Sequence, residues 1–278
     1  MTPHPAQFNE LIRLAIQEDL ATGYDLSSLV LPQDQISKFG IFSRQNGILA
    51  GVFLIPHILS MVDPKLNYEI LIKDGQNLKH GNLIASISGP LASVLLVERT
   101  CLNFLSHLSG VASLTAQFVA QVENTKTRIV DTRKTLPGFR ALQKYAVRVG
   151  GGFNHRFGLH DMVLIKDNHW LYIGSLKKAV EEIRSMLGHA VKIEVEADSL
   201  DQFREALEAR VDAVLLDNMS LNDIRTAVSE NAGTVILEAS GGITLENVRD
   251  YALAGVDIIS IGKITHSAPA LDFGLDEI

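Results

Sequence analysis

The chain has 278 residues, of which 46% are hydrophobic and 21% are charged, and its formal net charge is −7. This composition is typical of a folded globular protein, and the length suits one large domain or two smaller ones. The acidic balance argues against nucleic acid as a partner, because binding to a phosphate backbone requires a net basic face. Any gathering of positive charge in this chain therefore serves a confined site.

The sequence also predicts a compartment. Cys101 is the only cysteine, which excludes an internal disulfide and a cysteine-based metal cluster. The stretch 1–20 lacks the basic start and the unbroken apolar run of a secretory signal. No window reaches the ~18 to 20 apolar residues that span a bilayer. We expect a cytoplasmic protein that binds neither a membrane nor nucleic acid.

The first part of the chain predicts a mixed domain of helices and short strands. Apolar residues recur at helical spacing from Phe8 to Ile16. Residues 93–122 are also helical in pattern, either continuous or interrupted at Ser109-Gly110. We expect an N-terminal α+β sandwich domain over residues 1–110, with the tail 268–278 packing back on it. Its strand-like runs, separated by glycine and proline, are 39–44, 47–55, 66–72 and 82–90.

From about residue 125 strand and helix patterns alternate, which predicts a parallel sheet. We expect an α/β protein whose residues 111–267 form a TIM-like β/α barrel of about six strands, closed or incomplete. An open doubly wound sheet is the alternative, and the absence of GxGxxG after the first strand argues against it. The strand candidates, rich in Val and Ile as strands buried on both faces should be, are 128–131, 162–166, 191–197, 212–217, 234–239 and 256–262.

Polar or small residues follow every predicted strand of this second part. In a β/α barrel the carboxyl ends of the strands meet at one face, and sites are built there. Strand ends are in general more polar than strand middles, but the residue types here favour a site over that explanation. They are Arg133, Lys134, Lys166, Glu196, Asp217, the turn Ser240-Gly241-Gly242, and Gly262.

Positive charge gathers in the stretch DTRKTLPGFRALQKYAVRVGGGFNHRFGLHDMVLIKDNH, which holds seven lysines and arginines against three aspartates. Converging cations repel one another unless an anion lies among them, and arginine binds carboxylate or phosphate through a planar fork. Arg133 and Arg156, which lie next to strand ends and glycines, therefore predict a small ligand with more than one negative group. We interpret Arg140, Lys144 and Arg148, at four-residue spacing, as the solvated face of a helix.

Two carboxylates are candidates for a metal site. Glu196 and Asp217 end neighbouring predicted strands, and a pair of carboxylates with open positions suits Mg²⁺. The same two residues could instead neutralise Lys134 or Lys166 as buried ion pairs. Glu194 points the same way as Glu196 in an alternating strand, so the pattern does not choose between these glutamates.

A phosphate site is predicted at the late strands. Ser240, Gly241 and Gly242 precede a helical pattern at residues 245–254, and glycine-flanked amides at the start of a helix bind phosphate. Gly262, on the next strand, would complete such a site. No Ser-His-Asp or Cys-His arrangement is evident, so the chemistry is expected to rely on positioning and charge stabilisation.

Together these motifs resemble the quinolinate phosphoribosyltransferase family. The resemblance covers nearly the whole chain and rests on the basic stretch quoted above, ERTCLNFLSHLSGVA, KIEVEA, VLLDN, EASGGI and the closing GKITHSAPALDF. It implies a homodimeric glycosyltransferase that moves phosphoribose from phosphoribosyl pyrophosphate to quinolinate, with Mg²⁺. Loss of CO₂ then gives nicotinate mononucleotide and pyrophosphate, in de novo NAD synthesis.

The resemblance also implies residue roles. Quinolinate would be bound by Arg133, His155, Arg156 and Lys166. Lys134 would contact phosphoribosyl pyrophosphate. Glu196 and Asp217 would position the ribose hydroxyls and Mg²⁺, and the family pattern selects Glu196 over Glu194. The 5-phosphate would be bound by Ser240, Gly241, Gly242 and Gly262. Arg99 would enter the site of the neighbouring subunit. The residues expected to contribute to catalysis are Lys134, Lys166, Glu196 and Asp217.

One segment departs from the family's pattern, and two other functions stay open. The run EDLATGYD has Ala21 in place of a glycine and Tyr24 placed before Asp25, which questions a local turn more than the activity. A Schiff-base lyase that uses Lys166 as its nucleophile is one alternative. A non-catalytic binder of phosphorylated metabolites is the other.

Overall fold

The computed structural model describes residues 2–21, 23, 25–32 and 34–278. The chain divides into two compact units, each with its own sheet. The first unit comprises residues 1–116, 135–151 and 263–278, and the second comprises residues 117–134 and 152–262.

These units differ from the continuous boundaries expected from the sequence, because residues 135–151 lie with the first unit. Gln143 of this segment is fully buried. Its amide nitrogen lies 2.9 Å from His107 Nε2 and donates a hydrogen bond of 2.7 Å to the carbonyl oxygen of Thr265. A buried amide needs such partners, so this network holds the segment to the first unit.

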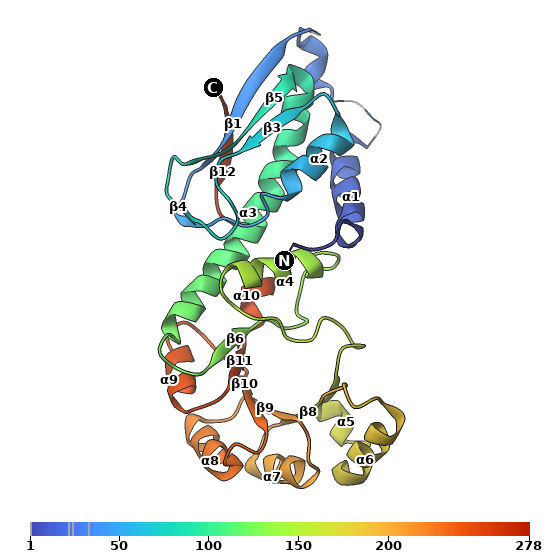
Figure 1. Ribbon diagram of the computed structural model, residues 1–278, viewed down its shortest axis with the longest axis vertical. Helices are drawn as coiled ribbons and strands as arrows, with labels where there is room; N and C mark the ends of the chain where they lie inside the picture. The colour runs from blue at the N-terminus through green and yellow to red at the C-terminus, as the bar shows by residue number, and fades with distance from the viewer. Residues whose placement is uncertain (1, 22, 24, 33) are drawn as a thin grey trace. The chain divides into compact units, whose positions relative to one another are not determined.

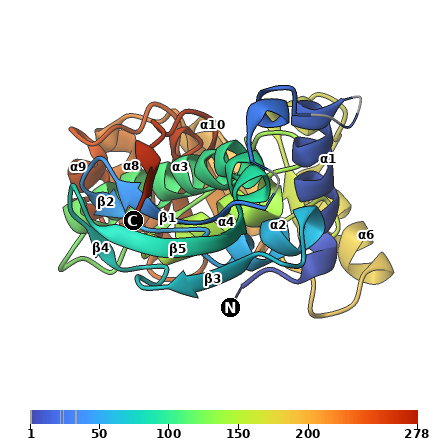
Figure 2. The same ribbon diagram turned by 90° about the horizontal axis from the view of Figure 1, so that it is seen from above.

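The first unit is built on an antiparallel sheet of four strands in the order β12-β1-β5-β3. Both views show α3 running along one face of this sheet (Figures 1 and 2). The strands are β1 (Ile36–Ser43), β3 (Asn67–Ile70), β5 (Leu83–Pro90) and β12 (Phe273–Glu277), with a separate pair β2 (Gly47–Ile48) and β4 (Asn77–Leu78). The helices are α1 (Asn9–Leu20), α2 (Leu54–Val62), α3 (Leu91–Gln121, whose last turn belongs to the second unit), α4 (Arg140–Val149) and α10 (Lys263–His266), with short 3₁₀ turns η1 (Pro5–Gln7) and η2 (Ser27–Val30).

The C-terminal strand β12 forms one edge of this sheet. It pairs antiparallel with β1, from Phe39 opposite Glu277 to Ser43 opposite Phe273. An ion pair of 2.6 Å between Arg44 and Asp276 lies beside this pairing. Two segments from opposite ends of the sequence therefore complete one sheet.

Helix α3 is continuous through Ser109 and Gly110, where an interruption was one of the two predicted forms. The pair serves close packing: Ser109 Oγ accepts a hydrogen bond of 3.0 Å from the Ala50 N–H, and a Cβ at Gly110 would lie 2.2 Å from Pro269 O. Within the described part of the chain, neither α3 nor any other helix combines the length and the apolar character needed to cross a membrane.

The run 47–55 was predicted as a strand, and this is wrong beyond Ile48. The chain turns at Gly51, whose φ of +100° suits glycine, and enters α2 at Leu54. Figure 2 shows α2 beside α1. The contact includes Phe8 against the ring of Phe53, with centroids 5.6 Å apart. Tertiary packing of apolar side chains here favours a helix over the strand that the composition suggests.

The solvated face proposed for the helix of the basic stretch is wrong for one residue. Lys144 on α4 is only 3% exposed, whereas Arg148 is exposed and Arg140 is half-buried and bonded to Thr135 Oγ1 at 3.0 Å. Leu142 and Ala146 are fully buried on the same helix. Helix α4 is therefore covered over more of its surface than a single apolar stripe implies.

Helix α1 ends at the segment that departs from the family's pattern. Ala21 has a φ of 38° and its N–H bonds the Gln17 carbonyl at 2.8 Å. This conformation is in the left-handed region that glycine adopts more readily than alanine. Alanine at this position therefore costs some backbone strain. Tyr24 lies outside the described residues.

The second unit holds a parallel sheet of six strands in the order β6-β11-β10-β9-β8-β7. Neighbouring strands from β7 to β11 follow chain order, which excludes a doubly wound sheet with its reversal of order. The edge strands β6 and β7 are not paired with each other in the described residues, and β6 makes one isolated bridge, from Val130 to Phe153 in the loop before β7. The predicted six-stranded β/α barrel is therefore confirmed in its incomplete form. Its strands are β6 (Arg128–Val130), β7 (Val163–Ile165), β8 (Ile193–Ala197), β9 (Ala213–Asp217), β10 (Ile236–Ser240) and β11 (Ile258–Ser260).

Serine begins three of the helices that connect these strands. Ser175, Ser199 and Ser220 each accept a hydrogen bond from a backbone N–H of the first turn, as N-cap residues do. Figure 1 shows α7 and α8 beside β8 and β9. The helices of the unit are α5 (Asp167–Trp170), α6 (Leu176–Met186), α7 (Leu200–Glu208), α8 (Leu221–Asn231) and α9 (Val248–Leu253).

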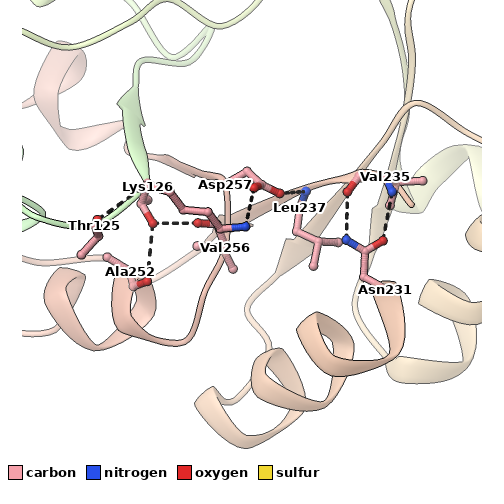
Figure 3. Close-up of polar contacts among 9 residues, drawn as sticks. Thr125, Lys126, Asn231, Val235, Leu237, Ala252, Val256 and Asp257 are labelled. Carbon is pink, nitrogen blue, oxygen red and sulfur yellow. Dashed lines mark hydrogen bonds and ion pairs between the residues drawn. The ribbon is translucent and has the colours of Figure 1, made fainter. Parts of the chain in front are cut away.

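Polar side chains tie together the amino ends of the strands (Figure 3). Asp257 pairs with Lys126 at 2.6 Å and accepts a hydrogen bond from the Leu237 N–H at 3.0 Å. Asn231 bonds both backbone groups of Val235. This end of a β/α barrel contributes stability, and it leaves the carboxyl ends of the strands for a site.

Candidate active site

A pocket of about 340 Å³ opens at the carboxyl ends of the barrel strands. All of its lining residues belong to the second unit. They are Thr132, Arg133, Lys134, His155, Arg156, Leu164, Lys166, Glu196, Leu215, Asp217, Glu238, Ser240 and Ser260. Cationic and anionic side chains therefore share one small cavity.

Asp131, the last residue of the first predicted strand, organises one wall. It is fully buried. Its Oδ2 accepts a hydrogen bond of 2.6 Å from Asn154 Nδ2, and its Oδ1 accepts one of 2.9 Å from the His155 N–H. These bonds fix the start of the loop that carries His155 and Arg156. Neither Asp131 nor Asn154 was among the predicted site residues.

Two buried glutamates flank His155 beneath the pocket. Glu194 Oε2 lies 3.2 Å and Glu238 Oε2 lies 3.3 Å from His155 Nε2. The two carboxylates are on β8 and β10 and are 2% and 1% exposed. Buried charges are stable only when paired, so this triad is one electrostatic unit. Glu238 was not among the predicted site residues. It could have been found as an acidic residue inside an otherwise apolar predicted strand.

The triad shifts the proton affinity of its members. Burial lowers the pKa of His155, but the carboxylates of Glu194 and Glu238 outweigh it and raise this pKa to about 10. Burial, and then the nearby Glu238 carboxylate, raise the pKa of Glu194. Two carboxylates thus compete for one cationic partner, and the imidazolium form of His155 is favoured.

The same triad has the residue types of a metal site, but its geometry favours an ion pair. The Arg156 N–H lies 2.7 Å from His155 Nδ1, so in a neutral ring the proton is on Nε2. An imidazolium also carries a proton on Nδ1, which cannot accept from the Arg156 N–H, so protonation of His155 loses this bond. In both forms Nε2 carries a proton and faces the carboxylates, whereas a metal ligand needs an unprotonated nitrogen.

Lys166 and Glu196 form the clearest ion pair of the pocket, with 2.6 Å between Nζ and Oε2. The short helix α5 supports both residues. The Lys166 N–H donates to His169 Nδ1 at 2.8 Å, and the indole N–H of Trp170 donates to the Glu196 carbonyl oxygen at 2.8 Å. The alternation in β8 left Glu194 and Glu196 equivalent, and their different partners now separate their roles.

Asp217 lies on the strand next to Glu196. Burial and then the Glu196 carboxylate raise the pKa of Asp217, against smaller opposing effects of Lys166 and Lys134. Proximity of like charges is what a divalent cation relieves, and carboxylate oxygens are the ligands that Mg²⁺ prefers. Glu196 and Asp217 therefore fit a cation. Glu196 also makes the ion pair with Lys166 that was the alternative prediction, but the pair is not buried, since the Lys166 side chain is 46% exposed.

The glycine turn after β10 differs from the prediction in one respect. Helix α9 begins at Val248, later than the pattern suggested, so the turn does not lead directly into the first turn of the helix. Asn247 bridges the gap: its Oδ1 accepts from the Thr244 N–H at 2.8 Å and its Nδ2 donates to the Gly242 carbonyl at 3.0 Å. A Cβ at Gly242 would meet no atom within 4 Å, which leaves space at this turn.

Most of the predicted site residues come together, and four do not line the cavity. Those that line it are Arg133, Lys134, His155, Arg156, Lys166, Glu196, Asp217 and Ser240. Gly241, Gly242 and Gly262 follow the lining residues Ser240 and Ser260 within two positions along the chain. Arg99 lies on α3 in the first unit, with a side chain that is 63% exposed and 3.8 Å from Glu98.

An incomplete β/α barrel with an acid- and base-lined pocket at the carboxyl ends of its strands defines a barrel enzyme. Residues 25–109 match the family description "Quinolinate phosphoribosyl transferase, N-terminal domain", and residues 111–276 match the corresponding C-terminal domain. The chain belongs to the quinolinate phosphoribosyltransferase family.

Individual relatives agree over nearly the full length. The nicotinate-nucleotide pyrophosphorylase (carboxylating) of Mycobacterium leprae is 42% identical, over 96% of this chain and 96% of that protein. A probable nicotinate-nucleotide pyrophosphorylase (carboxylating) of Bacillus subtilis is 40% identical, over 97% of this chain and 93% of that protein. The solved structure of the nicotinate-nucleotide pyrophosphorylase from Francisella tularensis has a TM-score of 0.94 at 39% identity and covers 100% of this chain and 98% of that one.

Proposed function

We propose that this chain transfers phosphoribose from phosphoribosyl pyrophosphate to the ring nitrogen of quinolinate. The transfer releases pyrophosphate, and loss of the 2-carboxylate as CO₂ gives nicotinate mononucleotide, a step of de novo NAD synthesis. The observation that carries the proposal is one pocket that joins the cationic side chains of Arg133, Arg156 and Lys166 to the carboxylates of Glu196 and Asp217. The printed names of the relatives agree with this reaction.

Quinolinate is a dicarboxylate, and the basic side of the pocket suits it. Arg133 and Arg156 can bind carboxylates through their planar forks. Against the effect of burial, Glu194 and Glu238 raise the pKa of His155, which favours a positive ring on this side of the pocket. Burial, and then repulsion from Arg133, lower the pKa of Arg156, and a bound anion between the two arginines would relieve that repulsion.

Phosphoribosyl pyrophosphate belongs on the side of Lys134, Glu196, Asp217 and the Ser240-Gly241-Gly242 turn. The bond between the ribose carbon and pyrophosphate breaks with positive charge developing on the ribose, and Lys134 offsets the charge of the leaving pyrophosphate. The ring nitrogen of quinolinate then bonds to that carbon. As CO₂ leaves, the electron pair of the breaking carbon–carbon bond stays on the ring carbon, where the adjacent positive nitrogen stabilises it. That carbon then takes a proton from water, which gives nicotinate mononucleotide.

Glu196 and Asp217 would hold Mg²⁺ and orient the ribose hydroxyls. When bound, Mg²⁺ would neutralise the negative charge of the phosphates without any transfer of a proton. Gly241, Gly242 and Gly262 let the backbone approach the 5-phosphate closely. Lys166 acts through its charge on a substrate carboxylate.

The lyase alternative is disfavoured by the state of Lys166. Its ammonium is paired with Glu196 at 2.6 Å, and imine formation requires an amine with a free electron pair. A binder without turnover would have no need for the paired carboxylates.

We further infer a cytoplasmic homodimer in which Arg99 reaches the partner's site. The exposed side chain of Arg99 supports this arrangement. The single, buried cysteine is consistent with a reducing compartment.

Mass spectrometry of the products tests the proposal. The reaction contains purified protein, quinolinate, phosphoribosyl pyrophosphate and Mg²⁺, with nicotinate replacing quinolinate in a parallel tube. Nicotinate mononucleotide from quinolinate alone is expected. Product from nicotinate alone would assign a salvage activity instead, and product from neither, with an adduct on Lys166 after borohydride, would support the lyase.

Single-residue variants test the proposed roles of Arg133 and Lys166. Arg133→Ala and Lys166→Ala are each expected to lower kcat/KM about 100-fold or more, because each removes a fixed charge beside the substrate. Arg225→Ala, an exposed arginine on α8, is the matched control and should behave as wild type. Turnover at the wild-type rate in both site variants would contradict these roles.

A further inference from the structure

We propose that Asn218 is a positioning residue that fixes the Asp217 carboxylate and joins it to the turn Ser240-Gly241-Gly242. The proposal rests on the proposed function, since it assigns Asn218 to the part of the site that holds phosphoribosyl pyrophosphate. Asn218 itself lies beside the pocket and is not one of its lining residues.

The first contact is between side chains. Asn218 Nδ2 donates a hydrogen bond of 2.8 Å to Asp217 Oδ2. A carboxylate only accepts hydrogen bonds, so the amide nitrogen must be the group that faces it. This bond occupies one oxygen of the carboxylate and leaves the other for a ligand.

The second contact is made by the backbone. The Asn218 N–H donates a hydrogen bond of 3.0 Å to the Ser240 carbonyl oxygen. To do so, Asn218 adopts a φ of 54°. Asparagine tolerates this left-handed conformation better than most residues with a side chain. The bond continues the pairing of Asp217 with Ser240 by one residue past the end of the two strands.

The third contact is a close approach of the Asn218 side chain to Gly241. A Cβ added at Gly241 would lie 2.1 Å from Asn218 Oδ1 and 2.5 Å from its Cγ. The amide therefore occupies the space that a side chain at position 241 would need. The two residues fit each other, and the glycine is required by Asn218 as well as by its own φ of +87°.

These three contacts connect Asp217, which is proposed to orient the ribose hydroxyls, to the turn Ser240-Gly241-Gly242, which is proposed to bind the 5-phosphate. If the amide is removed, Asp217 can rotate and the turn loses its packing partner. The quinolinate side is held by other groups, since Asp131 anchors the His155 loop and the Met162 carbonyl accepts from Arg156 at 3.2 Å. Removal of the Asn218 amide should therefore weaken the binding of phosphoribosyl pyrophosphate more than that of quinolinate.

Steady-state kinetics of Asn218→Ala, with both substrates varied, tests the proposal. We expect KM for phosphoribosyl pyrophosphate to rise about tenfold, as loss of a hydrogen bond to a charged group does, while KM for quinolinate stays within about twofold. Asn222→Ala, an exposed asparagine on α8, is the matched control and should leave both values unchanged.

Asn218→Gly separates positioning from backbone strain. Glycine adopts the required φ freely but lacks the amide. If the amide positions Asp217, the glycine variant shows the same defect as the alanine variant. If Asn218 only tolerates the turn, the glycine variant has wild-type KM values and the proposal is overturned.

Asn218→Asp keeps the shape but places a second carboxylate beside Asp217. It should raise KM for phosphoribosyl pyrophosphate more than Asn218→Ala does, and it remains informative if the alanine variant does not fold. If the KM values for both substrates shift equally, or if no folded variant shows a shift in KM, the role of Asn218 is overturned and the proposed function still stands. A wild-type protein without turnover would overturn the proposed function and this inference together.

Discussion

Two buried carboxylates and one largely buried imidazole lie together at the pocket. Glu194 and Glu238 lie 3.2 and 3.3 Å from His155 Nε2. Taking charges out of water is costly, and the cost is recovered only through the partner. His155 is thus both a part of the proposed quinolinate site and the counter-charge of the barrel interior.

Removal of the imidazole should therefore destabilise the fold. His155→Ala is expected to lower the free energy of unfolding by about 3 kcal/mol, because it leaves buried carboxylates without a cation. The measurement is urea unfolding at neutral pH. His160→Ala is the matched control, since His160 is 78% exposed. Adding Glu238→Gln to His155→Ala should recover part of the loss, and a double variant no more stable than the single one would contradict the pairing.

The pH dependence of stability follows from the raised pKa of His155. The folded value is about 10 and the unfolded value is 6.5, so the folded state binds this proton more tightly. The contribution of His155 is fully present below the unfolded value and is lost as pH rises through the folded value. Urea midpoints from about pH 6 to about pH 10 should fall more steeply for wild type than for His155→Gln. Parallel slopes would show that the ring is neutral in the folded protein.

At the scale of single elements, packing overrides local preference in α3. Glycine is a poor residue for a helix interior, and Ser109-Gly110 therefore suggested a break. The helix continues because Gly110 lies against the backbone at Pro269. The residue that weakens the helix in isolation is the one that allows its tertiary contact.

Gly110→Ala is accordingly expected to destabilise the protein although alanine favours helix. The added Cβ would lie 2.2 Å from Pro269 O, and overpacking of this kind costs about 1 to 3 kcal/mol against the ~1 kcal/mol gained in propensity. We expect a lower melting temperature by calorimetry. Gly188→Ala, where a Cβ meets nothing within 4 Å, should not lower it. A stabilised Gly110→Ala variant would contradict the close approach.

The barrel strands show how far an element can be predicted. The run 212–217 is apolar from Ala213 to Leu216, because both faces of the strand are covered. All six predicted strands are present. The run 47–55 has similar composition but becomes strand and helix in turn. Composition alone does not separate a buried strand from a buried helix when the run is short.

At the scale of the whole molecule, the proposed homodimer makes a prediction of its own. A subunit with Arg99→Ala and a subunit with Lys166→Ala are each expected to be nearly inactive alone. If Arg99 serves the partner's site, a mixed dimer contains one complete site, and an equal mixture after subunit exchange should recover about one quarter of wild-type activity. Arg225→Ala in place of Arg99→Ala is the control for exchange. If mixtures that form hybrid dimers recover no activity, Arg99 does not serve the partner's site and acts within its own subunit.

The sequence by itself determined the class of the protein, the number of barrel strands and their places along the chain, and most residues of the pocket. It did so because strands buried on both faces and polar residues at strand ends are local patterns, and the family motifs are long. Only the tertiary structure decided what each side chain contacts. Glu194 and Glu196 are equivalent in an alternating strand, yet one pairs with His155 and the other with Lys166. Such partners come from distant positions, and their selection depends on burial, which no local pattern contains.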